Sequence, residues 1–181
     1  MASRSAEHLK RSRQVLGTVA ARDLGPLVER LLAGPGTVWV IGNGGSQANA
    51  SHMVLHLQER GLRAHDLLAE TASITAVSND TDYAKVASAT LRRLAGKGDS
   101  LIVITGSGDS PNVVLALVEA RRLGMWTFGL LGFDGGQALA LCGNAVLVVS
   151  KDYGCIEDAH SAVIHAINAE LGGLTKPRTP L

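Results

Sequence analysis

The sequence predicts an α/β fold in which helices cover both faces of a parallel sheet. Three observations predict it: short apolar segments alternate with helical ones, the loops between them are short, and the apolar segments are rich in Val, Leu and Ile. A strand buried on both faces of a sheet reads as a continuous apolar run. Residues 38–41 and 101–104 are such runs. Strands interleaved with helices in this way favour a parallel sheet.

Two helices open the chain, over residues 3–22 and 24–33, and the second ends at the breaker cluster Ala33-Gly34-Pro35-Gly36. Five strands are then expected over residues 37–42, 64–68, 100–105, 125–131 and 145–149. The helices between and after them are expected over residues 46–60, 83–95, 111–123, 136–142 and 156–172. Pro111 follows Ser110 as a first-turn proline follows an N-cap residue, which fixes the start of one of them.

A length of 181 residues suits one domain, made of an N-terminal helical hairpin (3–33), an α/β core (37–172) and a frayed tail (173–181). The net charge of +1 argues against nucleic acid or an acidic membrane as partners, and no apolar run has membrane-spanning length. The N-terminal helices carry more apolar surface than a hairpin buries. That surface fits an oligomer interface or packing on the parent domain equally well.

The two cysteines, Cys142 and Cys155, do not form a recognisable disulfide framework, so a cytoplasmic location is expected. Cys155 lies near the later histidines in the sequence. A small apolar role is favoured for it, and a ligating or reactive role is the alternative.

Two turns rich in Gly and Ser each follow a predicted strand: Gly42-Asn43-Gly44-Gly45-Ser46 and Thr105-Gly106-Ser107-Gly108-Asp109-Ser110. Glycine allows a sharp turn that brings backbone N–H groups close to a ligand. Hydroxyl groups and a following helix N-terminus then make an anion site. Two such turns on one sheet predict a bound phosphate, with the rest of the ligand lying across the strand ends.

The histidines give the second signal. His52 and His56 are spaced i, i+4 on the helix after the first turn, so both imidazoles lie on one face. Glu157 and His165 are eight residues apart on the last helix and also share a face. Three imidazoles and a carboxylate suit zinc or a similar divalent ion. The alternative is that the histidines are ordinary surface or core residues. His160 is a weaker candidate because it is five residues from His165 and so on another face, and His8 and His65 are treated as structural.

With these motifs, the chain resembles the sugar isomerase (SIS) fold and, within it, the phosphoheptose isomerase family. The resemblance covers residues 5–172 and rests on motifs that occur in the family's order: Gly42-Asn43-Gly44-Gly45-Ser46, Ala50-Ser51-His52, Ser78-Asn79-Asp80, Ser107-Gly108-Asp109-Ser110, Asp134-Gly135-Gly136, and Ile156-Glu157-Asp158-Ala159-His160 through His165. The family converts sedoheptulose 7-phosphate into an aldoheptose 7-phosphate. The resemblance implies a five-stranded parallel sheet and a homotetramer with active sites between subunits.

The resemblance also implies roles for individual residues. The phosphate is expected at the hydroxyls of Ser46, Thr105, Ser107 and Ser110 and near the Gly44 backbone. Asn43, Arg60 and Asp80 match positions that contact or orient the sugar, and His165 matches the family's catalytic histidine. In members that bind zinc, the ligands match His52, His56, Glu157 and His165.

Several positions depart from the family pattern. His56 stands where the family has the glutamate that is its expected base, and Glu157 stands where the family has glutamine. Gly154 replaces an Asp that the family places near the sugar. Asp109 adds a negative charge near the expected phosphate, which is unfavourable unless its carboxylate points away. These changes leave the phosphate site intact and bear on the choice of sugar.

Aldose–ketose isomerisation moves a proton between C1 and C2 through an enediol(ate), which needs a base, and an acid or a metal to stabilise the oxyanion. Glu157 is the first candidate for the base and His165 for the acid, and His56 is the alternative base. Three other functions compete: isomerisation of another heptulose or octulose phosphate in antibiotic-sugar biosynthesis, a non-catalytic SIS protein that binds a replication initiator, and a regulatory domain that binds a sugar phosphate. His165 favours an enzyme, because the non-catalytic relatives tend to lose it.

Overall fold

The structure is a computed structural model that describes residues 3–34 and 36–174. Its centre is a sheet of five parallel strands in the order β2-β1-β3-β4-β5. The strands are β1 (Val38–Ile41), β2 (Ala64–Asp66), β3 (Ser100–Thr105), β4 (Trp126–Leu131) and β5 (Asn144–Leu147). The predicted α/β fold with a five-stranded parallel sheet is therefore confirmed, and each strand lies where the apolar runs place it.

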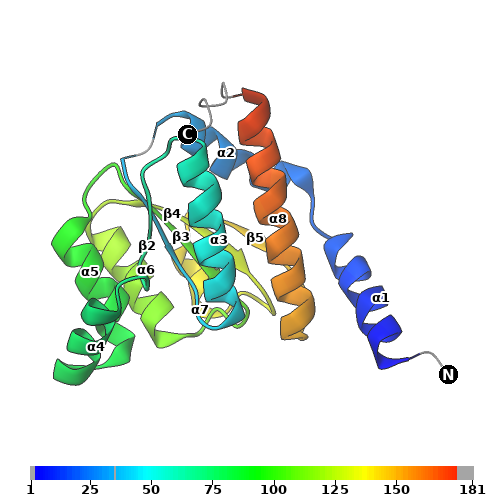
Figure 1. The fold of residues 1–181 in the computed structure, drawn as a ribbon, viewed down its shortest axis with the longest axis horizontal. Coiled ribbons are helices and arrows are strands. Elements are labelled where there is room, and N and C mark those ends of the chain that lie inside the picture. The colour runs from blue at the N-terminus through cyan, green and yellow to red at the C-terminus, as the bar shows by residue number, and fades with distance from the viewer. Residues whose placement is uncertain (1–2, 35, 175–181) are drawn as a thin grey trace.

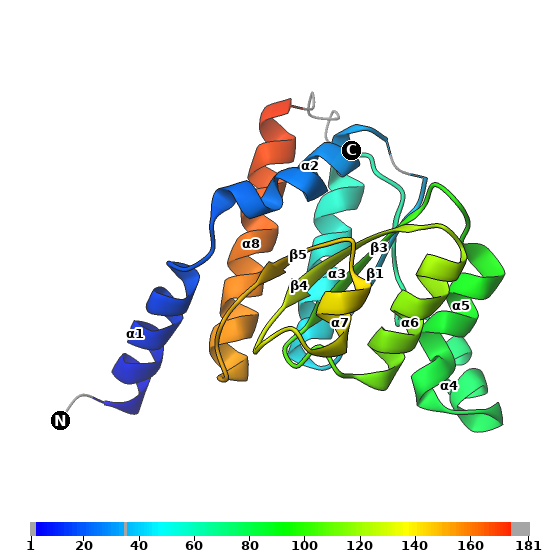
Figure 2. The same ribbon diagram turned by 180° about the vertical axis from the view of Figure 1, so that it is seen from behind.

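Helices cover both faces of this sheet (Figures 1 and 2). One face carries α2, α3 and α8, and the other carries α5, α6 and α7. The bounds of the helices are α1 (Arg4–Leu16), α2 (Gly25–Leu32), α3 (Gly45–Glu59), α4 (Thr71–Asp80), α5 (Val86–Leu94), α6 (Pro111–Arg122), α7 (Gly136–Leu141) and α8 (Tyr153–Leu174), with 3₁₀ turns η1 (Ala21–Leu24) and η2 (Tyr83–Lys85).

The strand β1 shows why the strands read as continuous apolar runs. Val38 and Val40 point into the core under α2, α3 and α8, whereas Trp39 and Ile41 point into the core under α5 and α6. All four side chains are buried, because successive residues of a strand face opposite sides and both sides are covered. The same alternation in β3 holds the centre of the sheet rigidly between the two helix layers.

The N-terminal segment differs from the single helix expected over residues 3–22. The helix α1 ends at Leu16, Gly17 caps it, and the Thr18 hydroxyl donates to the Val15 carbonyl at 2.7 Å. The chain then turns through η1 into α2. The helix α1 packs along α8, whereas α2 packs on the core of the sheet, so the two helices do not form a hairpin packed on itself (Figure 2).

The helix α4 was not expected from the sequence. None of its residues is buried, so it carries no apolar stripe that a periodicity argument could detect. The expected tail lies outside the described residues from 175 onward, and residues 173 and 174 belong to α8. Among the described helices, none is both long and apolar enough to cross a membrane.

The pair α3 and α8 positions the site. The two helices lie side by side and run parallel, both starting at the edge of the sheet where the strands end (Figure 1). Asn49 Nδ2 donates to the Glu157 carbonyl at 3.0 Å near their starts, and Arg60 Nε donates to Asn168 Oδ1 at 2.8 Å near their ends. Residues of α3 therefore meet residues of α8 at matching heights.

Candidate active site

A small cavity of about 90 Å³ lies where α3, α6 and α8 begin. Three helix N-termini at one place supply unpaired N–H groups and partial positive charge, which favour an anion. Five hydroxyl groups and an amide add hydrogen-bonding capacity. The cavity is lined by Asn43, Ser46, Thr105, Gly106, Ser107, Ser110, Tyr153 and Glu157.

Glycines shape the first turn of this pocket. Gly44 is the N-cap of α3 with φ +56°, a left-handed conformation that favours glycine. A Cβ on Gly42 would collide with the backbone of Ser46 and Gln47. Both positions let the chain fold back tightly after β1, and the turn delivers the buried Ser46 to the pocket.

The hydroxyls in the second turn keep their protons free for a ligand. Thr105 Oγ1 accepts from the Gly108 N–H at 3.2 Å, and Ser107 Oγ accepts from the Asp109 N–H at 3.3 Å. Ser110 occupies the N-cap position of α6 but makes no side-chain capping bond. An oxyanion can therefore receive hydrogen bonds from these hydroxyls without breaking the turn.

Asn43 is held by an amide pair that the sequence did not reveal. Its Nδ2 donates to Asn112 Oδ1 and its Oδ1 accepts from Asn112 Nδ2, both at 2.9 Å. Tyr83 also donates its hydroxyl to Asn43 Oδ1 at 2.8 Å. The position of Asn112 in the first turn of α6 was the one available signal, because first-turn residues lie beside a helix-end anion site.

The carboxylate of Asp109 points away from the pocket. Its Oδ1 accepts from the Gln137 backbone N–H at 3.0 Å and from Gln137 Nε2 at 3.2 Å. The start of α7 thus takes up this negative charge. The condition set from the sequence, that Asp109 must turn away for a phosphate to bind nearby, is met.

Tyr153 and Glu157 form the side of the pocket that belongs to α8. The Tyr153 ring packs against Gly106 and lies 5.0 Å from the Phe133 ring. The Glu157 carboxylate packs against Gly45, where any side chain would collide with it. Tyr153 was missed from the sequence, where a single tyrosine at the start of a helix gives no signal.

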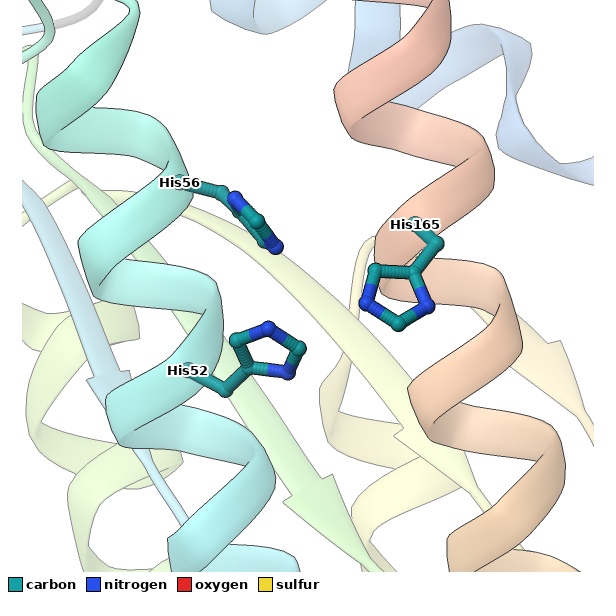
Figure 3. A group of neighbouring side chains, drawn as sticks. All are labelled: His52, His56 and His165. Atoms are coloured by element: carbon teal, nitrogen blue, oxygen red, sulfur yellow. The ribbon is translucent and has the colours of Figure 1, made fainter.

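Farther along the same helix pair, three histidines face one another across the gap between α3 and α8 (Figure 3). Their ligand nitrogens all lie within 4.8 Å of one another. The ring centroids are 4.5 Å apart for His52 and His56, 5.0 Å for His52 and His165, and 5.6 Å for His56 and His165. Glu157, the fourth expected ligand, is not part of this group and contacts Gly45 instead.

The chemistry of these three rings fits a divalent metal such as zinc. His56 Nε2 is buried and has no hydrogen-bond partner among the described residues, while His56 Nδ1 lies 3.1 Å from Glu59 Oε2. The same Nδ1 also lies 3.2 Å from Asn168 Nδ2, so it meets both an acceptor and a donor. Nε2 is the ring nitrogen left without a protein partner, and it is therefore the one available to a metal. Three protein ligands with an open fourth position is the arrangement of catalytic zinc sites.

The state of His52 supports the same use. Burial lowers the pKa of His52 below its ordinary value, and the nearby rings of His56 and His165 lower it further. The neutral ring is therefore favoured near pH 7, and a neutral imidazole is the form that binds a metal.

Arg60 and Asp80 do not line the small cavity in the single chain. Arg60 donates to Asn168, whose Nδ2 lies 3.2 Å from His56 Nδ1, so one side chain links Arg60 to the histidine group. Asp80, at the end of α4, lines a separate cavity of about 550 Å³ together with Lys85 and Arg92. The structure therefore does not bring these two expected sugar contacts to the pocket within one copy of the chain.

Comparison with known proteins agrees with this geometry. Residues 20–132 match the model of the SIS domain family. The chain is 40% identical over 134 residues to the phosphoheptose isomerase of Trichlorobacter lovleyi, covering 71% of this chain and 68% of that one. It is 36% identical over 170 residues to the phosphoheptose isomerase of Pelobacter propionicus, covering 87% and 90%.

A solved structure of phosphoheptose isomerase from Neisseria gonorrhoeae superposes with a TM-score of 0.87 at 29% identity, covering 94% of this chain and 97% of that one. The fold and the site thus define a protein of the SIS class. The chain belongs to the SIS domain family and, within it, to the phosphoheptose isomerases.

Proposed function

We propose that this protein is an aldose–ketose isomerase that converts sedoheptulose 7-phosphate into an aldoheptose 7-phosphate through an enediol(ate). One observation carries the proposal: an anion pocket and a group of imidazoles lie at two heights of one helix pair. The pocket receives the phosphoryl group, and the rings meet the carbons that react. Membership of the phosphoheptose isomerases supports the choice of substrate.

The phosphoryl group is proposed to bind at the hydroxyls of Ser46, Thr105, Ser107 and Ser110 and at the N–H groups near Gly44. Asn43, fixed by Asn112, is placed to orient the sugar beside the phosphate. A phosphate held at several points fixes the rest of the ligand in position, so remote binding energy lowers the barrier at the reacting carbons.

His52, His56 and His165 would hold a zinc ion or another divalent metal. Bound there, the metal would act as a Lewis acid on the carbonyl and the adjacent hydroxyl. The support comes from the nitrogen-only donor set and from the buried, unpartnered Nε2 of His56. Glu59 and Asn168 both contact Nδ1 of His56, which leaves Nε2 as the nitrogen that would bind the metal.

We assign proton removal from carbon to Glu157 and proton donation to oxygen to His165, with His56 as the alternative base. Glu157 lies outside the histidine group, so it is free to take a proton. His165 is the exposed member of the group, and it can donate a proton to the substrate only while its ring does not bind the metal.

The Glu157 carboxylate lines the pocket in the absence of ligand, where it would repel a phosphate dianion. We propose that it rotates along α8 toward the histidines when the phosphoryl group enters. Glu157 and His165 share a face of α8, so the rotation needs no change in the backbone. The substrate itself would then place the base beside C1 and C2.

The test is to incubate the protein with sedoheptulose 7-phosphate and to detect an aldoheptose phosphate. Glu157→Gln and His56→Ala separate the two candidate bases. Replacement of the true base should slow the reaction at least about tenfold, which corresponds to a barrier raised by about 1.4 kcal/mol. If neither variant is slowed to that extent, both assignments are wrong. Zinc content measured on the same preparations shows which variant has lost its metal.

Another heptulose or octulose phosphate is the second candidate substrate. His56 and Glu157 replace residues that the family has as glutamate and glutamine. His56 belongs to the histidine group, and the proposed rotation would bring Glu157 to it. Side-by-side turnover of these ketose phosphates decides between them. A preference for the longer sugar would overturn the first choice while leaving the isomerase chemistry in place.

A homotetramer is the proposed active form, with its active sites between subunits. Exposed leucines on the N-terminal helices support it: Leu9 is 68% exposed, and Leu16 and Leu32 are 43% exposed. Asp80, which lines a separate cavity within one copy, fits such a site better than one within a single chain. Light scattering gives the mass in solution.

Cys142 and Cys155 are free thiols, which supports the proposed cytoplasmic location.

A further inference from the structure

A second group of metal-ligating side chains lies at the corner where α1 meets the start of α8. It consists of His8, Asp152 and Cys155, whose ligand atoms lie within 4.8 Å of one another. His8 comes from α1, whereas Asp152 and Cys155 come from the first turn of α8 and the residue before it. The fold thus brings together an imidazole, a carboxylate and a thiol from opposite ends of the chain.

The local contacts hold these three side chains in place. The Cys155 N–H donates to Asp152 Oδ1 at 3.3 Å, and Ser12 Oγ lies 3.5 Å from Cys155 Sγ. On the outer side, Asp158 Oδ2 lies 3.4 Å from His8 Nε2 and accepts from the Ser12 hydroxyl at 2.8 Å. Asp158 lies outside the group of three but stands where a partner that orients His8 would stand.

A missing side chain makes room for the imidazole. A Cβ on Gly154 would lie 3.1 Å from Cε1 and 3.8 Å from Nε2 of the His8 ring. The first of these distances is too short for an ordinary contact, so any larger residue at position 154 would push His8 outward. Glycine at this one position lets the ring approach Asp152 and Cys155.

The charges at this corner suit a cation. Asp152 supplies one carboxylate, whose Oδ1 accepts from the Cys155 N–H. Asp158 adds a second carboxylate. Arg11 Nη2, at 3.6 Å from Asp152 Oδ2, is the opposing cation, but its side chain is 59% exposed and free to move into solvent.

A metal site at this corner would stabilise the packing of α1 on α8. None of its residues is buried, and its packing on α8 depends on the polar contacts of this corner together with Val15, which packs at the edge of a small core cluster. A ligand that joins His8 to α8 would fasten a helix that has little apolar burial of its own.

We propose that His8, Asp152 and Cys155 form a second metal site, which binds a thiolate-preferring divalent cation such as Zn²⁺ and fastens α1 to the start of α8. Sulfur, nitrogen and carboxylate donors are those that zinc takes in proteins. The thiolate distinguishes this site from the histidine group, which offers nitrogen donors alone. The proposal is independent of the proposed isomerase activity.

Cobalt(II) tests the site on the full chain after the bound metals have been removed with a chelator. A thiolate bound to Co²⁺ gives a charge-transfer band in the near ultraviolet, and the three histidines cannot produce it. The wild-type protein should show the band on titration. His8→Ala should weaken Co²⁺ binding at this band at least about tenfold.

Matched controls identify the sulfur and the site. Cys142→Ser should keep the band, because burial raises the pKa of Cys142 to about 12 and keeps that thiol protonated. His52→Ala should keep it too, whereas Cys155→Ser should lose it. Since Cys155 is buried and its replacement could unfold the chain, the conclusion rests on His8→Ala, a partly exposed surface position.

A band absent from the wild-type protein, or one unchanged in His8→Ala, overturns the site. Trypsin tests the fastening of α1, which carries cleavage sites at Lys10, Arg11 and Arg13. Zn²⁺ should slow cleavage there about tenfold in the wild type and not in His8→Ala. Equal cleavage with and without Zn²⁺ in the wild type overturns the fastening role.

Discussion

The two ends of the α3–α8 pair differ in how completely their polar groups are satisfied. At the start of the helices, Thr105 and Ser107 have hydrogen-bond partners within their turn and Asn43 has Asn112 on α6, and the cavity between them is small. Farther along, the Nε2 of His56 is buried without a partner. The first end is a preorganised anion site, whereas the second is a group of metal-ligating side chains whose ligand atoms are not all satisfied.

The difference separates binding from chemistry. Groups that satisfy one another in the free protein can hold a ligand in a fixed place at little reorganisation cost. An unsatisfied buried nitrogen costs stability, and such costs are typical of functional sites. Changes at the imidazole end should therefore affect turnover most, and changes at the hydroxyl end should affect affinity most.

The largest effect is expected for His165→Ala, which removes the proposed acid and one metal ligand. The kcat should fall at least about a hundredfold, since positioned acid–base groups contribute 10²- to 10⁴-fold. The thermal midpoint should change little in the metal-free protein because His165 is exposed. Steady-state kinetics and thermal unfolding test both statements. An unchanged kcat would show that His165 takes no part in the reaction. The control is His65→Ala, because His65 is also exposed and lies on β2.

Ser107→Ala should act mainly on substrate affinity. It removes a hydroxyl that donates to the phosphoryl group, a charge-assisted bond worth about 1.5–3 kcal/mol, so kcat/KM should fall about tenfold to a hundredfold. Most of the change should appear in KM. Kinetics with Ser73→Ala on α4 as the control test this. A loss confined to kcat would contradict the separation of the two ends.

His160 lies on the inward face of α8 and is buried, whereas His165 on the same helix is exposed. His160 is fully buried, and burial lowers its pKa to about 4, partly offset by the Leu131 backbone. Between pH 6.5 and pH 4 the unfolded chain binds a proton at this position and the folded chain does not, so stability falls as the pH falls. By pH 5 the loss from this group is about 2 kcal/mol.

His160→Leu removes that contribution, so its stability should fall by about 2 kcal/mol less than the wild type between pH 7 and pH 5. Urea unfolding at the two pH values measures the difference. Equal losses in the two proteins would show that His160 titrates normally in the fold. His65→Gln, at an exposed position, should keep the wild-type loss.

The smallest effect is expected on phosphate binding by Glu157→Gln, and this change is favourable whereas the change in turnover is not. Inorganic phosphate should inhibit the variant about three- to tenfold more tightly, because a negative charge leaves the pocket. Turnover should fall at the same time if Glu157 is the base. Inhibition constants and kcat from one set of assays show the split. Weaker phosphate binding would contradict the rotation of Glu157 out of the pocket.

The sequence sufficed for the sheet, the glycine turns and the family, because buried strands and tight turns leave local patterns. The helix α4 left none, since all its residues keep contact with solvent. The meeting of His52 and His56 with His165 followed from two spacings and the family resemblance, since no local pattern sets two distant helices side by side.

Other features depend on contacts that no spacing encodes. Glu157 shares a face of α8 with His165, but its carboxylate lies against Gly45 rather than beside the rings. The amide pair of Asn43 and Asn112 joins residues 69 positions apart. The place of α1 along α8 was likewise open, because a helix with no buried residue carries no strong preference for one partner.

The pocket at the start of α3, α6 and α8 is lined, within the described part of the chain, by no Lys or Arg. Its attraction for anions therefore comes from oriented peptide dipoles, which have no proton to gain or lose. Once Glu157 has left, the pH dependence of affinity at this end belongs to the substrate: it should follow the second ionisation of the phosphate monoester, at a pKa of about 6.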